Sequence, residues 1–292
     1  MSFLSGLEAF VRASEPLAMH TWFQLGGPAE YFAEPRNVDE LVAVIRRARE
    51  EDLAVHLLGR GTNLLIRDEG VPGVVITLSD PTFRKVEVAG NAITAGAGVR
   101  LGRVVTTAVH GGLAGLEGLV AIPGTFGGAV FGNAGAHGDD IGQWVAQVTV
   151  LTDGCEILQR DRDELVFDYR YSSLDDPVIL AGRLELEEED PRELSRRMQK
   201  HWIVRKARQP MGHESSGCIF RNPPGLHAGE LIDRAGLKGT RIGGAVVSMR
   251  HANFIIAEPE CTSQDVLRLI DLIRTQVEQR LEVELEQEID VW

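Results

Sequence analysis

Two glycine-rich segments constrain the fold of this 292-residue chain more than any other feature. The first glycine segment is residues 59–66 (GRGTNLLI), and the second glycine segment is residues 121–138 (AIPGTFGGAVFGNAGAHG). Clustered glycines adopt positive φ, bring the backbone close to a ligand and present N–H groups to anionic oxygens. Because Arg60 is the sole Lys or Arg in the two segments, we interpret them as backbone sites for the pyrophosphate of a dinucleotide. The alternative is that the glycines only form tight turns.

The charge balance argues against nucleic acid as a partner. The chain has 30 Lys plus Arg against 43 Asp plus Glu, a formal charge of −13, whereas phosphate-backbone binding needs a basic surface. No apolar stretch approaches the ~20 residues of a membrane span, and the N-terminus lacks the pattern of a secretory signal. Cys155, Cys218 and Cys261 are too scattered for a disulfide framework or a zinc site, and the histidines show no metal-binding motif. We therefore expect a cytoplasmic protein without a metal; the oligomeric state is left open, with a monomer plausible.

A strand, a helix and a second strand precede the first glycine segment. Residues 29–34 and 54–58 are the expected strands, and residues 37–48 the expected helix, which begins with Asn37 and Glu40 at the spacing of a capping box. The second strand runs directly into the first glycine segment. Ligands gather at such strand ends in α/β units.

Hairpins and helices alternate in the rest of the chain. Asp190 before Pro191, and Thr262 three residues before Asp265, are signals for helix starts. In chain order we expect a hairpin (85–88 with 92–95), a helix (101–110), a hairpin (145–151 with 155–159), a strand (178–186), a helix (190–207), a helix from Thr262 and a strand (281–292).

Five motifs in this order resemble the UDP-N-acetylenolpyruvoylglucosamine reductase family, the flavoenzymes of bacterial peptidoglycan precursor synthesis. Beside the two glycine segments they are residues 167–172 (FDYRYS), 217–223 (GCIFRNP) and 285–288 (LEQE), and the resemblance extends from about residue 17 onward. The IPGTxGGAVxxNAG pattern is long and specific. The short connection between Arg170 and Cys218 is similar to the subclass that lacks an extra substrate-covering loop.

The resemblance implies an α+β fold with a two-lobed, vanillyl-alcohol-oxidase-like (PCMH-type) FAD-binding domain and a smaller α+β substrate-binding domain. We place the first at residues 1–190, with lobes at about 1–84 and 85–190, and the second at residues 191–292. The resemblance assigns the FAD contacts to Gly59, Arg60, Gly61, Thr62, Asn63 and Leu64 in the first glycine segment, and to Ile122, Pro123, Gly124, Thr125, Gly128, Ala129, Asn133, Ala134 and Gly135 in the second.

The implied reaction reduces a UDP-sugar enolpyruvyl ether with NADPH, through FAD, to UDP-N-acetylmuramate. NADPH and the substrate take turns in one site. Charge builds up at C2 of the ether and on its carboxylate when hydride adds to C3, so preorganised positive charge and a proton donor are needed. The resemblance assigns these roles to Arg170, to Cys218 as the proton donor, and to Glu288 as a carboxylate that works with Arg170. Tyr169, Arg208 and Asn222 fall at positions of substrate contacts.

Each catalytic assignment has a simpler alternative. Arg170 can be a surface arginine stacked on a tyrosine, Cys218 a small buried cysteine, and Glu288 one carboxylate of a solvated acidic strand face. Cys218 also departs from the serine of familiar members, although a thiol with a reference pKa of about 8.5 stays mostly protonated at neutral pH. Ile289 and Asp290 after Glu288 depart from the usual Glu-Val-Arg.

Three functional alternatives stay open. A flavin oxidase or dehydrogenase of the same fold would keep the glycine segments without needing Arg170, Cys218 and Glu288 as a set. A flavin- or nucleotide-binding protein would keep the cofactor and show no turnover. A covalent role for Cys218 lacks an adjacent histidine base in the sequence.

Overall fold

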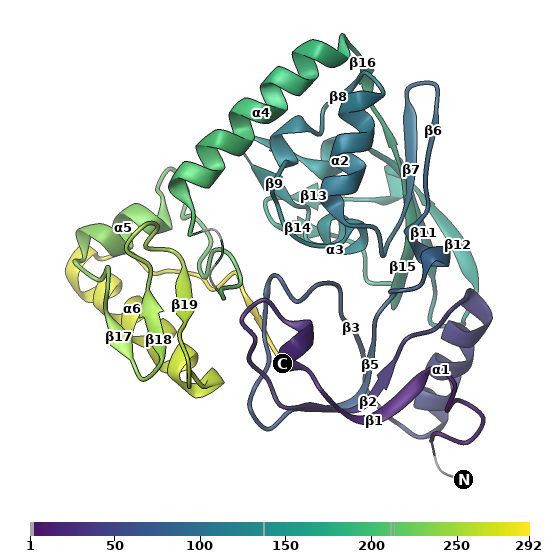
Figure 1. Cartoon of the computed structure of the whole chain (residues 1–292), viewed down its shortest axis with the longest axis horizontal. Helices are drawn as coiled ribbons and strands as arrows, with labels where there is room; N and C mark the ends of the chain where they lie inside the picture. Colours follow the sequence, from purple (N-terminus) through teal and green to yellow (C-terminus); the bar gives the residue numbers. More distant parts are fainter. Residues whose placement is uncertain (1–2, 137, 211, 213) are drawn as a thin grey trace. The chain divides into compact units, whose positions relative to one another are not determined.

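The computed structural model describes residues 3–136, 138–210, 212 and 214–292, and it divides into two compact units (Figure 1). Unit 1 comprises Met1–Ala13, Tyr31–Gly59 and Gly73–Arg205, and unit 2 comprises Ser14–Glu30, Arg60–Pro72 and Lys206–Trp292. The chain crosses between the units within the first glycine segment, because Gly59 belongs to unit 1 and Arg60 to unit 2. His137, in the second glycine segment, lies outside the described residues.

Two sheets organise unit 1, and strands of the first sheet continue into residues assigned to unit 2. The first has the strand order β1-β2-β5-β3, with β3 parallel to β5, and the second has the order β12-β11-β15-β7-β6 with antiparallel pairs. The first sheet consists of β1 (Val11–Pro16), β2 (Pro28–Ala33), β3 (Val55–Leu57) and β5 (Val71–Ile76). The second consists of β6 (Val86–Ala89), β7 (Ala92–Gly96), β11 (Val145–Leu151), β12 (Ile157–Asp161) and β15 (Val178–Glu185).

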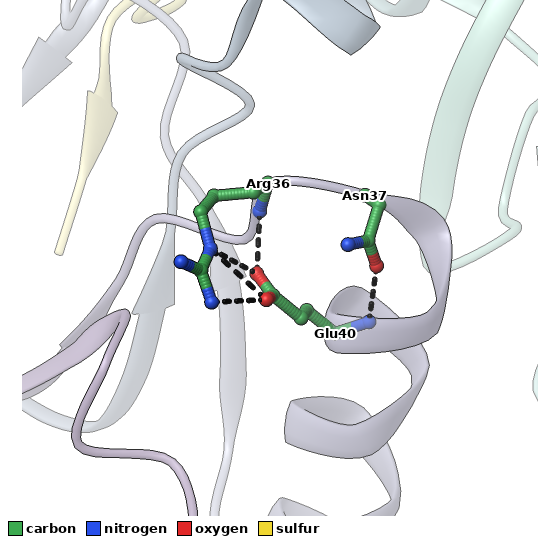
Figure 2. A network of polar contacts seen from close by, with 3 residues as sticks. All are labelled: Arg36, Asn37 and Glu40. Carbon is green, nitrogen blue, oxygen red and sulfur yellow. Dashed lines mark hydrogen bonds and ion pairs between the residues drawn. The ribbon is translucent and has the colours of Figure 1, made fainter.

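Helix α1 (Val38–Glu50) begins at the polar network in Figure 2. The Asn37 side chain accepts a hydrogen bond from the Glu40 N–H at 2.9 Å, which satisfies one of the first N–H groups of the helix. The Glu40 carboxylate accepts the Arg36 backbone N–H at 2.8 Å and its guanidinium at 2.5 Å, and the guanidinium bond holds the pKa of Glu40 below its ordinary value. The predicted capping signal is confirmed, with the return bond displaced by one residue to Arg36. The apolar side of α1 is buried.

Two helices pack on the second sheet of unit 1 (Figure 1). They are α2 (Leu101–His110), as predicted, and α3 (Phe126–Phe131), which lies inside the second glycine segment. A Cβ on Gly127 would lie 2.7 Å from the Cβ of Ala97, so glycine allows α3 to approach the end of β7 closely. Three two-stranded pairs complete the unit: β8 (Leu113–Ala114) with β16 (Glu187–Glu188), β9 (Gly135–Ala136) with β10 (Asp139–Asp140), and β13 (Phe167–Asp168) with β14 (Tyr171–Ser172).

Unit 2 has its own hydrophobic core, built around a small sheet and two helices. The sheet has the order β17-β18-β19, with α6 against it and α5 against α6. A parallel pair joins β4 to β20, near the end of the chain. The elements are β4 (Leu64–Leu65), α5 (Ala228–Arg234), β17 (Arg241–Ile242), β18 (Ala245–Val247), β19 (Ile255–Ala257), α6 (Ser263–Leu281) and β20 (Asp290–Val291); α4 (Pro191–Arg208) passes from unit 1 into unit 2.

The predicted helix starts are confirmed, whereas the predicted C-terminal strand is wrong in most of its length. Asp190 accepts the Arg192 N–H at the start of α4, and Thr262 and Asp265 form the capping box of α6. Helix α6 continues to Leu281 and ends with Glu282 in the left-handed region. Residues beyond it alternate in burial, but they form a named strand only in β20, and Gln287 adds a single antiparallel bridge to Phe220. An alternating pattern becomes a ladder only where a partner edge is available.

Among the described residues, no helix is long and apolar enough to cross a membrane.

Candidate functional site

The two glycine segments approach each other in unit 1. A Cβ on Gly59 would lie 2.9 Å from Oγ1 of Thr125, so the end of the first sheet and the start of α3 come together at these residues. The absence of a side chain on Gly59 is what permits this approach. Two of the predicted cofactor positions, far apart in sequence, are thus neighbours in the structure.

Gly61 continues the first glycine segment in unit 2 with a φ of +57°. It is buried, and a Cβ there would lie 2.7 Å from both the Thr21 Cα and the His20 carbonyl oxygen. Its carbonyl accepts the Trp22 N–H at 3.1 Å. Its own N–H makes no hydrogen bond within the described part of the chain. A buried donor without a partner is a position that a ligand can satisfy.

Packing explains part of the glycine content of the second glycine segment. Gly127 packs on Ala97, and a Cβ on Gly135 would lie 2.7 Å from the Asp139 carbonyl oxygen. Thr125 caps α3 by accepting the Gly128 N–H at 3.2 Å. The turn-and-packing alternative therefore holds for these glycines, and a ligand role remains open for residues 122–125 and for the exposed Gly128.

Tyr169 and Arg170 form the turn of the β13–β14 hairpin, which lies beside α3 (Figure 1). Arg170 has a φ of +56°, uncommon for a residue other than glycine, and its guanidinium carbon lies 5.4 Å from the centre of the Tyr169 ring. The stacked arrangement considered from the sequence is therefore present. Such strained residues gather at functional sites, where surrounding contacts hold them.

Asn133 holds this hairpin from the second glycine segment. Its side-chain amide donates to the Asp168 carbonyl at 2.8 Å and accepts the Gly142 N–H at 2.9 Å, and Asn133 is 1% exposed. Ser172 adds a bond from its hydroxyl to the Phe131 carbonyl at 2.6 Å. These bonds join the turn that carries Arg170 to the end of α3. An FAD contact of Asn133 stays a prediction.

Cys218 and Glu288 are brought to adjoining segments of unit 2. The Glu288 N–H donates to the carbonyl of Ile219, the neighbour of Cys218, at 2.8 Å. The Glu288 carbonyl accepts the side chain of Asn63, in the first glycine segment, at 3.1 Å. A Cβ on Gly217 would lie 3.8 Å from the Thr62 carbonyl oxygen. Three motifs that are distant in sequence therefore meet around the Glu288 backbone.

Burial separates Glu288 from the other acidic residues near it. Glu282, Glu284, Glu286 and Asp290 are exposed, whereas Glu288 is partly buried. Cys218 is also partly buried and forms no disulfide. The solvated-face alternative therefore describes the neighbours of Glu288 better than Glu288 itself.

The predicted substrate contacts are distributed over both units. Arg208 is exposed at the end of α4 in unit 2, and Tyr169 is 48% exposed in unit 1. Asn222 in unit 2 accepts the Ala228 N–H at 3.0 Å through its side chain, so it also helps to start α5. Of the predicted catalytic set, Arg170 lies in unit 1, while Cys218 and Glu288 lie in unit 2.

His251 and Asn253 support the segment after Cys218. Asn253 bonds to Phe220 through its side chain, and its N–H donates to Nδ1 of His251 at 3.3 Å. Burial lowers the pKa of His251 below its ordinary value, and the nearby charges of Lys238 and Arg208 lower it further. The imidazole is therefore neutral at pH 7, with Nδ1 as an acceptor.

Acidification is expected to destabilise the protein through His251. Since its pKa is lower in the folded state, the unfolded chain takes up the proton first as the pH falls below about 6.5, and stability decreases. Above that pH the contribution is constant. We expect the thermal midpoint of His251→Gln to fall less than that of the wild type between about pH 7.5 and pH 5.5, the range in which histidine titrates. Equal falls for the two proteins would contradict this prediction.

Gly61→Ala is expected to lower the content of bound cofactor. The added methyl would combine left-handed strain with overpacking against Thr21, at a cost of about 2–5 kcal/mol. Gly90→Ala is the matched control, because Gly90 has a φ of +60° and nothing lies within 4 Å of an added Cβ. The flavin-to-protein absorbance ratio of the purified variants measures the difference. A full flavin complement in Gly61→Ala would refute the prediction.

Among the described residues, no group of three or more His, Cys, Asp or Glu side chains is placed to hold a metal ion.

Two family models match the chain. A family model described as an FAD binding domain matches residues 29–159, and one described as the C-terminal domain of UDP-N-acetylenolpyruvoylglucosamine reductase matches residues 209–292. The crystal structure of a grass pollen allergen with glucose dehydrogenase activity, 13% identical, has a TM-score of 0.51 over 65% of this chain and 45% of its own. That likeness concerns the fold alone. The predicted α+β class with a PCMH-type FAD-binding fold is confirmed.

Two relatives are similar over nearly the full length. UDP-N-acetylenolpyruvoylglucosamine reductase 2 of Symbiobacterium thermophilum is 41% identical over 97% of this chain and 92% of its own. The crystal structure of the corresponding reductase from Thermus caldophilus is 37% identical, with a TM-score of 0.80 over 97% of this chain and 98% of its own. The chain belongs to the UDP-N-acetylenolpyruvoylglucosamine reductase family.

Proposed function

We propose that this protein reduces UDP-N-acetylenolpyruvoylglucosamine to UDP-N-acetylmuramate with NADPH, using bound FAD, in peptidoglycan precursor synthesis. The observation that carries the proposal is the meeting of Asn63, Ile219 and Glu288 in unit 2. It connects the first glycine segment and the Cys218 segment to the backbone of Glu288 through two hydrogen bonds. The three free cysteines support a reducing compartment such as the cytoplasm.

The described residues fit a flavin dinucleotide. The approach of Gly59 to Thr125 leaves no room for a side chain, and the N–H of the buried residue Gly61 has no partner within the described chain. We propose that residues 59–64 hold the pyrophosphate and that residues 122–135 contact the rest of the cofactor. When bound, FAD supplies the hydride that it has received from NADPH.

The catalytic side chains act on the charge that develops in the substrate. The guanidinium of Arg170 is a permanently charged, forked donor suited to a carboxylate, and it stabilises the enolate-like transition state. Cys218 delivers a proton from its thiol to C2. Glu288 works with Arg170 on the enol. Ser216, two residues before Cys218, is buried, and its hydroxyl has no partner in the described chain, so this segment has a donor to offer a ligand.

Three further side chains are proposed as substrate contacts. We propose that Tyr169 contacts the substrate next to Arg170, that Arg208 neutralises the diphosphate of the UDP-sugar, and that Asn222 contributes an amide. We also retain the division into an FAD-binding region, residues 1–190, and a substrate-binding region, residues 191–292. The reductase C-terminal family model lies within the latter.

The test is a pair of half-reactions followed by flavin absorbance. The purified protein is reduced anaerobically with NADPH, and UDP-N-acetylenolpyruvoylglucosamine is then added. Prompt reoxidation with formation of the lactyl ether is the expected result. A flavin that stays reduced after this addition would refute the proposed substrate and favour a same-fold oxidase or dehydrogenase.

A further inference from the structure

We propose that Asn253 is a positioning residue that fixes the Cys218 segment against Glu288. The inference rests on the proposed function, because it assigns Asn253 to the protonation step of that reaction. Asn253 is 2% exposed, so its polar side chain serves the interior of unit 2.

The Asn253 side-chain amide pairs with the backbone of Phe220 as a neighbouring strand would. Its Oδ1 accepts the Phe220 N–H at 2.9 Å, and its Nδ2 donates to the Phe220 carbonyl at 2.8 Å. Its backbone carbonyl accepts the Ile219 N–H at 2.9 Å. An asparagine side chain offers one acceptor and two donors, which match both polar groups of a single peptide residue. Asn253 thus holds the backbone of residues 219 and 220 from one side of this segment.

The opposite edge of the same segment carries Glu288. The Ile219 carbonyl accepts the Glu288 N–H, and the Arg221 N–H donates to the Glu286 carbonyl at 2.8 Å. Phe220 and Gln287 form an antiparallel bridge between these bonds. Residues 219–221 are therefore the middle of a three-membered ladder, with Asn253 on one side and residues 286–288 on the other. A shift of residues 219–221 after loss of the Asn253 bonds therefore displaces Cys218 relative to Glu288.

The loop that presents Asn253 is itself fixed. The Ser248 N–H donates to the Phe254 carbonyl at 2.9 Å, and the Phe254 N–H donates to the His251 carbonyl at 3.0 Å. The Ser248 hydroxyl accepts the N–H groups of Arg250 and His251. Asn253 donates its own N–H to the His251 ring. Preorganisation of this kind is what a positioned proton donor requires, because misplacement by about 1 Å can cost 10²-fold in rate.

The experiment compares the two half-reactions of the FAD-loaded enzyme. We expect Asn253→Ala to slow reoxidation of the reduced flavin by UDP-N-acetylenolpyruvoylglucosamine about 100-fold, while reduction by NADPH is unchanged. Asn253→Asp preserves the size and one acceptor but, when ionised, cannot donate to the Phe220 carbonyl. It is expected to slow the same half-reaction and provides the test if Asn253→Ala does not fold.

Asp265→Ala is the matched control for lost stability. Asp265 also accepts two backbone N–H groups in unit 2, from Gly244 and Thr262, at the start of α6. The Asp265→Ala variant should have a lower thermal midpoint than the wild type and the same rates in both half-reactions. Equal slowing of both half-reactions in the Asn253 variants, or no slowing in either, would overturn the inference. A wild-type flavin that the substrate does not reoxidise would refute the proposed function and this inference with it.

Discussion

Replacement of Arg170 by glycine is expected to slow reoxidation of the reduced enzyme by its enolpyruvyl substrate by about 10²–10³-fold, the range for loss of one transition-state donor. Reduction by NADPH should be unchanged, because no carboxylate charge develops in that step. Glycine is the informative replacement, since Arg170 has a φ of +56° and glycine adopts this conformation without strain. The loss then reports on the guanidinium rather than on the hairpin turn.

Two further variants separate the effect of the guanidinium from the effect of the backbone change. Arg170→Lys keeps the charge but not the planar fork, so it should recover only part of the rate. Glu282→Gly makes the same backbone change at a residue with the same φ, at the end of α6, and should alter neither half-reaction. A comparable slowing of both half-reactions in Arg170→Gly would assign Arg170 to structure. Stopped-flow flavin absorbance measures both rates.

Removal of the Cys218 thiol is expected to have an effect of similar size. Cys218→Ala should slow the substrate half-reaction by about 10²–10⁴-fold, the usual contribution of a positioned acid. Cys218→Ser keeps a proton donor and should remain active. Because a thiol ionises in the alkaline range and a serine hydroxyl does not, the alkaline decline in activity should move upward or disappear in this variant.

Cys261→Ser is the matched control for this pH profile. Burial, and then the charge of Asp265, raises the pKa of the Cys261 thiol to about 11. Its replacement should leave the profile as in the wild type. An active Cys218→Ser enzyme with an unchanged alkaline decline would exclude Cys218 as the titrating donor.

Local signals predicted much of the fold. Asn37 with Glu40, Asp190 with Pro191 and Thr262 with Asp265 each begin a helix as expected, because a cap is made by residues within one turn. Strand β5 was not predicted, since Pro72 and Gly73 interrupt its apolar run. Nor does local pattern show that residues 14–30 and 60–72 join residues 206–292 in one unit, because that depends on contacts distant in sequence.

Residues of the candidate site could be predicted only where they lie in a motif shared with the family. Arg170, Cys218 and Glu288 were assigned by family resemblance, and their catalytic roles stay predictions. The supporting roles of Asn133 and Asn253 were not predicted: Asn133 was assigned as an FAD contact and not as a support of the Arg170 hairpin, and Asn253 was given no role. Their importance follows from burial and from bonds to distant backbone groups.

The pairing of β4 with β20 determines when the first glycine segment can complete its hydrogen bonds. Asn63 and Glu288 are 225 residues apart, and the Asp290 and Trp292 N–H groups bond to the carbonyls of Asn63 and Leu65. A ribosome that adds about 5–20 residues per second needs roughly 10–45 s to synthesise the chain between them. Throughout that interval the first glycine segment lacks its strand partner. The first glycine segment therefore gains the hydrogen bonds that hold Asn63 and Leu65 only after residues 288–292 have emerged from the ribosome.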